Sequence, residues 1–249
     1  MIEKVSLLGR KTYKISDKVT VNIPTVGLTR GENIEDENNF WSEVGLFTIS
    51  PDDMCVDLEN YGIDFTQMSE YSLFTLLFSL QRDDKLSQQT PDLLFTDFSL
   101  WELELVQIEG KFVLIDSNKE VVIDEEIYNK LSDIISFITG HKKPKRLKFG
   151  NKFARKKWVE KEKRKREIAK KKKPKDTGGG VLDGIILRLV CNCNFPYNFE
   201  TVNDVTLFDL LYSLKQIEKD VSVTDLMQSR LVGVDLKKFT DKQLSRYVL

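Results

Sequence analysis

Residue types that often do chemistry are scarce in this chain of 249 residues. Cys191 and Cys193 have a spacing found in metal sites, but a zinc site needs four ligands, usually from two pairs. The third cysteine, Cys55, is remote, and His141 is the only histidine. One histidine leaves a single candidate base for nucleophilic catalysis, and no serine lies in a Gly-x-Ser-x-Gly turn. We therefore expect no metal ligand, and we predict that Cys191 packs at the end of an apolar helix.

Glycine and carboxylate clusters also have structural interpretations. The glycines at 178–180 precede an apolar helical stretch, but they follow a charge run rather than a strand, which indicates a linker and not a phosphate-binding loop. The acidic runs at 52–53 and 124–126 stand where helices are expected to begin, and carboxylates favour that end of the helix dipole. Glu102 and Glu104 fall on the solvent side of an expected strand. Because no nucleophile, base and orienting group can be named together, we predict a protein that is not an enzyme and has no cofactor.

Charge is divided sharply between one segment and the rest of the chain. Residues 141–176 carry 19 Lys+Arg against 4 Asp+Glu, whereas the whole chain has a formal net charge of −1, so the remainder is strongly acidic. This segment is the basic arm. Its candidate electrostatic binding residues are Lys152, Arg155, Lys156, Lys157, Lys163, Arg164, Lys165, Arg166, Lys170, Lys171, Lys172 and Lys173.

The basic arm has three interpretations. Residues 142–175 could bind nucleic acid phosphates, bind an acidic protein surface, or lie on the protein's own acidic body. Aromatic residues in the arm are limited to Phe149, Phe153 and Trp158, so base stacking on single strands is weakly supported. No helix-turn-helix or zinc-finger pattern surrounds the arm. Protein contact or self-docking is therefore favoured over nucleic acid binding.

The periodicity predicts an α+β fold, mostly helical, with a small antiparallel β meander and a long basic helical arm. A strand is expected at 19–23, and the meander at 101–105, 112–115 and 121–123. Loops are expected at 25–33 and 82–97. Helices are expected near 40–47, 50–62, 69–80, 124–140, 153–173, 182–190, 206–217 and 224–231, with a last turn or two at 240–247.

These elements predict an N-terminal α+β domain at 1–140, the basic arm as a linker at 141–180, and a C-terminal helical region at 181–249. The sparse, odd number of cysteines suits a reducing cytoplasm. The first residues lack a signal-peptide pattern, and no apolar run approaches the roughly 18 residues that span a bilayer. We therefore expect a cytoplasmic protein without its own membrane anchor.

The order of short motifs resembles a family of morphogenesis proteins of tailed bacteriophages and prophages of Gram-positive bacteria. The matching stretches are 21–27, 50–54, 62–65, 71–80, 98–140, 197–202 and 234–238. They are packing and turn motifs rather than catalytic signatures. The resemblance implies a tail-assembly component, commonly a chaperone that acts beside the tape-measure protein. The chain is longer than small helical tail chaperones and carries the meander, which leaves open a structural role in a tail or baseplate.

Two hypotheses follow from the arm and the resemblance. The first is a non-enzymatic phage tail-morphogenesis protein that acts by protein–protein contacts, with tape-measure or tail-tube protein as partner, in the host cytoplasm or in the virion. Apolar helical faces, an acidic body and a basic arm are compatible with binding partner helices. The alternative is a nucleic-acid-binding protein that uses residues 142–175.

Overall fold

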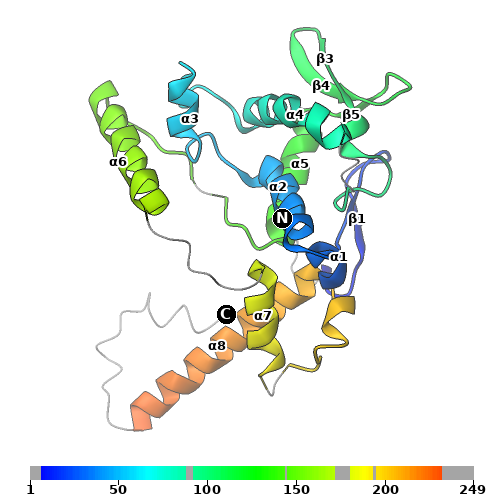
Figure 1. Cartoon of the computed structure of the whole chain (residues 1–249), viewed down its shortest axis with the longest axis vertical. Coiled ribbons are helices and arrows are strands. Elements are labelled where there is room, and N and C mark those ends of the chain that lie inside the picture. Colours follow the sequence, from blue (N-terminus) through cyan, green and yellow to red (C-terminus); the bar gives the residue numbers. More distant parts are fainter. Residues whose placement is uncertain (1–6, 88–91, 144, 172–179, 193–194, 232–249) are drawn as a thin grey trace.

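The computed structural model describes residues 7–87, 92–143, 145–171, 180–192 and 195–231. The strands are β1 (Thr12–Lys14), β2 (Thr20–Asn22), β3 (Glu104–Ile108), β4 (Lys111–Ile115) and β5 (Val121–Ile123). The α-helices are α1 (Val26–Arg30), α2 (Ile34–Thr48), α3 (Cys55–Asn60), α4 (Glu70–Ser87), α5 (Glu125–Ile138), α6 (Lys152–Lys171), α7 (Val181–Val190) and α8 (Leu207–Leu231). Two short 3-10 helices are η2 (Leu100–Glu102) and η3 (Val202–Asp204). The described chain therefore has the predicted α+β, mostly helical fold (Figure 1).

Aromatic side chains join the central helices α2, α4 and α5. Phe47 of α2, Phe74 of α4 and Tyr128 of α5 are each no more than 1% exposed. The ring centroid of Phe74 lies 5.1 Å from that of Phe47 and 4.8 Å from that of Tyr128. Burial of aromatic surface is the main stabilising contribution that such side chains make. The three helices therefore form one body around a shared aromatic centre.

The predicted meander is confirmed as the antiparallel sheet β3–β4–β5, and β1 and β2 form a separate antiparallel pair. The limits predicted for its first strand, 101–105, are wrong, because Trp101 and Glu102 belong to η2 and β3 begins only at Glu104. The β3–β4 turn is made by Glu109 and Gly110, whose φ angles are 50° and 79°. Positive φ at both turn residues is what a two-residue hairpin with matched strand twist requires. The Tyr71 hydroxyl of α4 donates to the Phe112 carbonyl at 2.7 Å and so ties the meander to the helical body.

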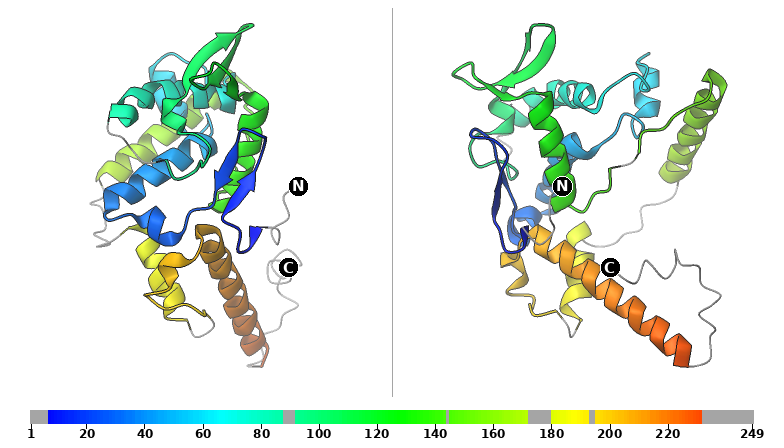
Figure 2. Two further views of the ribbon diagram at one scale, coloured as in Figure 1. Left: turned by 90° about the vertical axis from the view of Figure 1, so that its right-hand side faces the viewer. Right: turned by 180° about the vertical axis from the view of Figure 1, so that it is seen from behind.

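The C-terminal helices share a core with the N-terminal elements. Leu182 of α7 and Leu210 of α8 belong to the same buried cluster as Val21 and Phe40. Buried Glu37 of α2 accepts the Leu182 N–H at 3.1 Å, at the start of α7. Residues that precede the basic arm in the sequence and residues that follow it thus share one core. The domain limits at 140 and 180 stay a prediction. The distal part of α8 points away from this core (Figure 2).

The predicted loop at 25–33 is wrong, because it contains the five-residue helix α1. Thr25 caps α1 by accepting the Leu28 N–H, and Asn33 caps α2 in a reciprocal pair with Asp36. Gly31 separates the two helices with φ 59°, and a Cβ there would lie 2.2 Å from Asp36 Cβ. A helix of little more than one turn shows no measurable 3.6-residue period, so its apolar pattern cannot reveal it.

Four helix limits also differ from the sequence-based expectation. Helix α2 begins at Ile34, ahead of the residues near 40 where it was expected. Residues 51–54 form turns, and α3 begins only at Cys55. The Ser50 N–H donates to Asp53 Oδ2 and the Asp53 N–H donates to the Ser50 carbonyl, so these residues close a turn ahead of the helix. Helix α4 continues to Ser87, through polar residues expected to be a loop. Helix α8 is continuous from Leu207 to Leu231, where two helices were expected. The expected turn at 240–247 lies outside the described residues.

Candidate binding surface on the basic helix

Helix α6 packs against α3 through a second, smaller core. Val159 is 3% exposed and belongs to one buried cluster with Cys55 and Leu58 of α3, and with Phe65. Trp158 packs at the margin of this cluster. Figure 1 places α6 beside α3, on one side of the body. The basic arm therefore contributes an apolar contact and is not surrounded by solvent along this part.

Two arginines bind α6 to carboxylates of the acidic body. Arg155 donates to Glu59 Oε1 through Nε at 2.9 Å and Nη2 at 2.7 Å, and through Nη1 to Asp64 Oδ2 at 2.6 Å. Arg166 Nη1 donates to Asp57 Oδ2 at 2.7 Å. The planar guanidinium suits such forked contacts better than the lysine ammonium does. A hydrogen bond from Thr66, together with Arg155, lowers the pKa of Asp64.

The segment that leads into α6 is fixed to the same region by Asp52. Its Oδ2 accepts the Leu147 N–H at 2.7 Å and lies 3.7 Å from Arg146 Nε. Arg146 Nη2 donates to the Phe65 carbonyl at 2.9 Å. The Asp52 side chain is only 7% exposed, so an uncompensated charge there would be costly and the arginine offsets it. The contacts of this segment and the contacts between α6 and α3 together hold α6 in one orientation.

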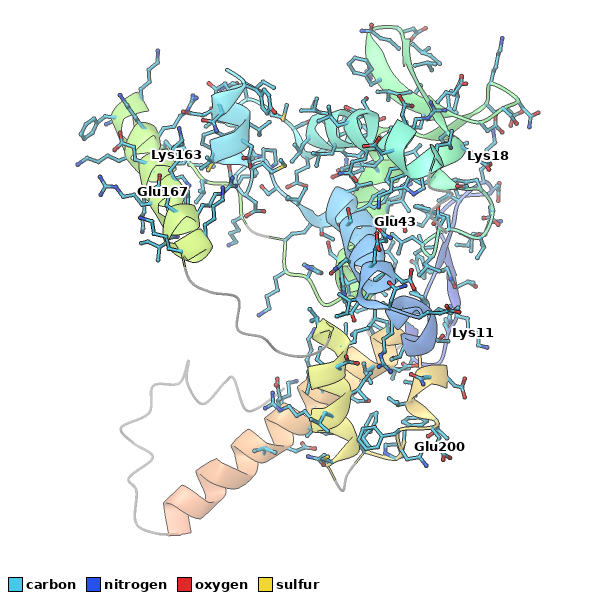
Figure 3. The ribbon with its side chains drawn as sticks, viewed as in Figure 1. Lys11, Lys18, Glu43, Lys163, Glu167 and Glu200 are labelled. Atoms are coloured by element: carbon cyan, nitrogen blue, oxygen red, sulfur yellow. The ribbon has the colours of Figure 1, made fainter. Side chains whose placement is uncertain are left out.

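The contacts divide the surface of α6 into two sides. The docked face consists of Arg155, Trp158, Val159, Glu162 and Arg166, which recur at helical spacing and are the residues of α6 that are not exposed. The other candidate binding residues within the described chain are exposed: Lys152, Lys156, Lys157, Lys163, Arg164, Lys165, Lys170 and Lys171. Figure 3 labels Lys163 together with Glu167, one turn further along α6.

The candidate binding residues therefore have different positions. Arg155 and Arg166 are engaged with the protein's own carboxylates. Lys165 forms a pair with Glu162 at 2.7 Å. Lys172 and Lys173 lie outside the described residues. The sequence run alone could not separate docked from outward cations, because that separation depends on which way the helix faces α3.

Arg155→Ala should loosen the contact between α6 and α3. The substitution leaves Glu59 and Asp64 without their shared guanidinium, and partly buried charged hydrogen bonds contribute about 1–2 kcal/mol. Local opening of α6 should then become roughly 5–30-fold more frequent. Amide hydrogen exchange over 152–171 measures this. Lys157→Ala on the outward side is the matched control, and equal acceleration in both variants would contradict the docking role.

The other residues singled out from the sequence do not form a site. Cys191 is exposed at the end of α7, so its predicted packing is wrong, and Cys193 lies outside the described residues. No group of three or more His, Cys, Asp or Glu side chains that could hold a metal occurs in the described part of the chain. His141 Nδ1 lies 2.9 Å from the Thr139 hydroxyl, and burial lowers the pKa of the imidazole. Gly180 stands at the N-cap of α7, where a Cβ would meet Glu37.

A carboxyl pair inside the fold, formed by buried Glu43 and half-buried Asp92, was not identified from the sequence. Glu43 of α2 is 4% exposed, and its pKa is raised well above the ordinary value, first by burial and then by Asp92. Asp92 accepts backbone N–H groups of Leu94, Phe95 and Leu100 at 2.7–3.1 Å. The signal was present, because Glu43 lies between Phe40 and Phe47 on the apolar side of α2. Its burial makes it a structural group rather than one that a ligand reaches.

A groove with a volume of about 590 Å³ lies between the N-terminal ends of α4 and α5 and the β3–β4 hairpin. Several of its polar groups are engaged within the fold: the Tyr71 hydroxyl bonds the Phe112 carbonyl, Ser69 bonds Ser72, and Asp124 caps α5. These groups serve the fold itself rather than converging on a ligand.

Comparison with protein-family models, with curated proteins and with solved structures found no match for this chain. Among the described helices, none combines the length and apolarity needed to cross a membrane. The exposed side of α6 is the surface with the most distinctive chemistry, since it gathers many cations on a helix that the body holds in place.

Proposed function

We propose that the protein is a non-enzymatic phage tail-morphogenesis protein that acts through protein–protein contacts made by the exposed side of α6. The sequence resemblance supplies the biological setting, with tape-measure or tail-tube protein as the partner and the host cytoplasm or the virion as the location. The observation that carries the binding role is that α6 is docked by one face and displays cations on the others.

The docking supports a binding role for a physical reason. An isolated run of lysines repels itself and loses conformational entropy when it binds. Here Val159, Arg155 and Arg166 already fix the helix against α3, so the exposed cations are arranged before a partner arrives. Pre-arranged cations steer an acidic partner and fix its orientation more than they add affinity. Such a surface suits an assembly protein that must bind and position a subunit.

Co-expression with phage tape-measure and tail-tube proteins tests the proposal. The tagged wild-type protein is expected to retain at least one of them through purification. The double variant Lys156→Glu and Lys163→Glu should lose most of that partner, because it reverses two exposed charges on α6. The double variant Lys11→Glu and Lys111→Glu changes charge equally on exposed positions outside α6 and should retain it. Retention of no virion protein by the wild type would refute the function.

Nucleic acid binding through the basic arm is the second candidate function. The exposed cations from Lys152 to Lys171 favour it, because phosphate neutralisation releases counterions and yields strong, salt-dependent affinity. A salt titration with duplex DNA and with RNA measures it. Tight binding with a steep salt dependence, lost in the Lys156→Glu and Lys163→Glu variant, would favour this function; absence of binding at low salt would remove it.

A further inference from the structure

One lane of exposed residues on α6 combines cations with apolar side chains. Phe153, Lys157, Lys161, Arg164 and Ile168 recur at spacings of four, four, three and four residues, so they share one side of the helix. At 100° per residue this outer lane lies nearly opposite the docked face. Phe153 is 65% exposed and Ile168 is 57% exposed, one at each end of the lane. The outer lane therefore has an apolar residue at each end and three cations between them, over a length of about 22 Å.

We propose that the outer lane binds an acidic helix of a partner protein, with carboxylates in the centre of that helix and an apolar residue on either side of them. This inference rests on the proposed function and names the chemistry of the partner. Carboxylates at helical spacing can face Lys157, Lys161 and Arg164, as charged flanks do between paired helices. The apolar residues of the partner bury Phe153 and Ile168, whose exposure has no role in the docking of α6.

Aromatic contacts support the order of the cations in the lane. Lys157 Nζ lies 4.7 Å from the centroid of the Phe153 ring, and Lys161 Nζ lies 5.6 Å from that of Trp158. Each contact restricts a long side chain that would otherwise lose its rotamer freedom on binding. Because Trp158 belongs to the contact with α3, the position of Lys161 depends on the docking of α6.

The same lane is poorly suited to a nucleic acid. Phosphates offer no apolar surface for Ile168, and Ile168 has no ring on which a base could stack. Glu160 and Glu167 are exposed beside the lane, where their carboxylates repel phosphates. A protein helix can place a basic or neutral residue opposite them. The described residues therefore favour a partner helix over a polynucleotide.

Two designed peptides test the inference with the full-length protein. Each is a helix-forming peptide of about 22 residues with three glutamates and two leucines. In the matched peptide these residues follow the lane spacing, and in the scrambled peptide the same residues are distributed around the helix so that no side carries all five. Fluorescence anisotropy at physiological salt should show at least about tenfold tighter binding of the matched peptide. Equal dissociation constants would overturn the inference.

Two variants separate the lane from charge alone. Phe153→Ser with Ile168→Ser should abolish the preference for the matched peptide, although no charge changes. Lys152→Ser with Lys170→Ser removes two exposed cations from the neighbouring side of α6 and should keep that preference. The inference would be overturned if duplex DNA bound more tightly than the matched peptide and if Phe153→Ser with Ile168→Ser left that DNA binding unchanged. A self-association, seen by sedimentation, that this double variant abolishes would also overturn it, because the occupant would then be a second copy.

The outcome is distinguishable from failure of the proposed function. If neither peptide is preferred while Lys156→Glu with Lys163→Glu still removes a tail protein in co-purification, only the helix inference fails. If the wild type retains no tail protein but prefers the matched peptide, the lane binds an acidic helix in a different setting.

Discussion

Replacing Phe74 with alanine should lower the free energy of unfolding by about 3–5 kcal/mol, the range for a large aromatic removed from a core. The ring is fully buried and contacts the rings of Phe47, Tyr71 and Tyr128, at centroid distances of 4.8–6.0 Å. The cavity left by the removed ring would be bounded by helices α2, α4 and α5, so a shift of one helix cannot fill it. Urea denaturation followed by circular dichroism measures the loss.

Phe153→Ala is the matched control for Phe74→Ala. Phe153 is 65% exposed on α6, and substitutions at such positions change stability by about 0.5 kcal/mol or less. The two variants remove the same atoms, so their difference reports burial alone. A loss below about 2 kcal/mol at Phe74, or similar losses in both variants, would show that the aromatic centre is not what joins the three helices.

Local signals in the sequence were sufficient for the elements with strong periodicity and capping. A helix was predicted at 124–140 with an acidic start: the Asp124 side chain accepts the Ile127 N–H at the N-cap of α5, and Gly140 follows the helix with a φ of 70°. The β meander was also confirmed, because its turn residues and alternating strands are adjacent in the chain. These features need only neighbouring residues.

Features that depend on distant residues were not predictable in the same way. Arg155 and its partner Glu59 are 96 positions apart, and nothing in a run of lysines and arginines distinguishes Arg155 from Arg164. Val159 is the one residue of α6 that is fully buried in the described chain, and a single valine makes no amphipathic stripe. The self-docking interpretation of the arm therefore describes one face of α6, and only the structure shows which face stays open.

The stability of the Glu43→Gln variant relative to the wild type should increase as the pH rises above about 5. Glu43 lies in the middle of α2 (Figure 3), and burial together with Asp92 raises the pKa of its carboxyl well above the ordinary 4.5. Burial raises the pKa of Asp92 as well, while the bonds from backbone N–H groups favour its ionised form. We infer that the pair holds one proton, on Glu43, which donates to the Asp92 carboxylate.

The sign of the pH dependence follows from that proton. Between pH 4.5 and the raised pKa of Glu43, the folded state keeps a proton that the unfolded chain has released. The free energy of unfolding of the wild type therefore falls with rising pH, by up to about 1.4 kcal/mol per pH unit for one proton. Glutamine at 43 keeps an N–H donor for Asp92 and has no proton to lose. The advantage of Glu43→Gln over the wild type should therefore grow from pH 5 to pH 8.

Urea denaturation at pH 5, 6, 7 and 8 measures this advantage, with two controls. Glu126→Gln alters an exposed carboxylate of α5 whose pKa the Lys130 hydrogen bond lowers, so its effect on stability should be the same at every pH from 5 to 8 and should change only at more acid pH. Asp92→Asn places an amide N–H₂ against the N–H donors of this loop and should destabilise at every pH, by about 1–3 kcal/mol. A constant difference between Glu43→Gln and the wild type from pH 5 to pH 8 would show that Glu43 does not hold the proton. A rising difference would identify the buried pair as a structural cost of the fold, confined to the interior and separate from the charges that α6 displays.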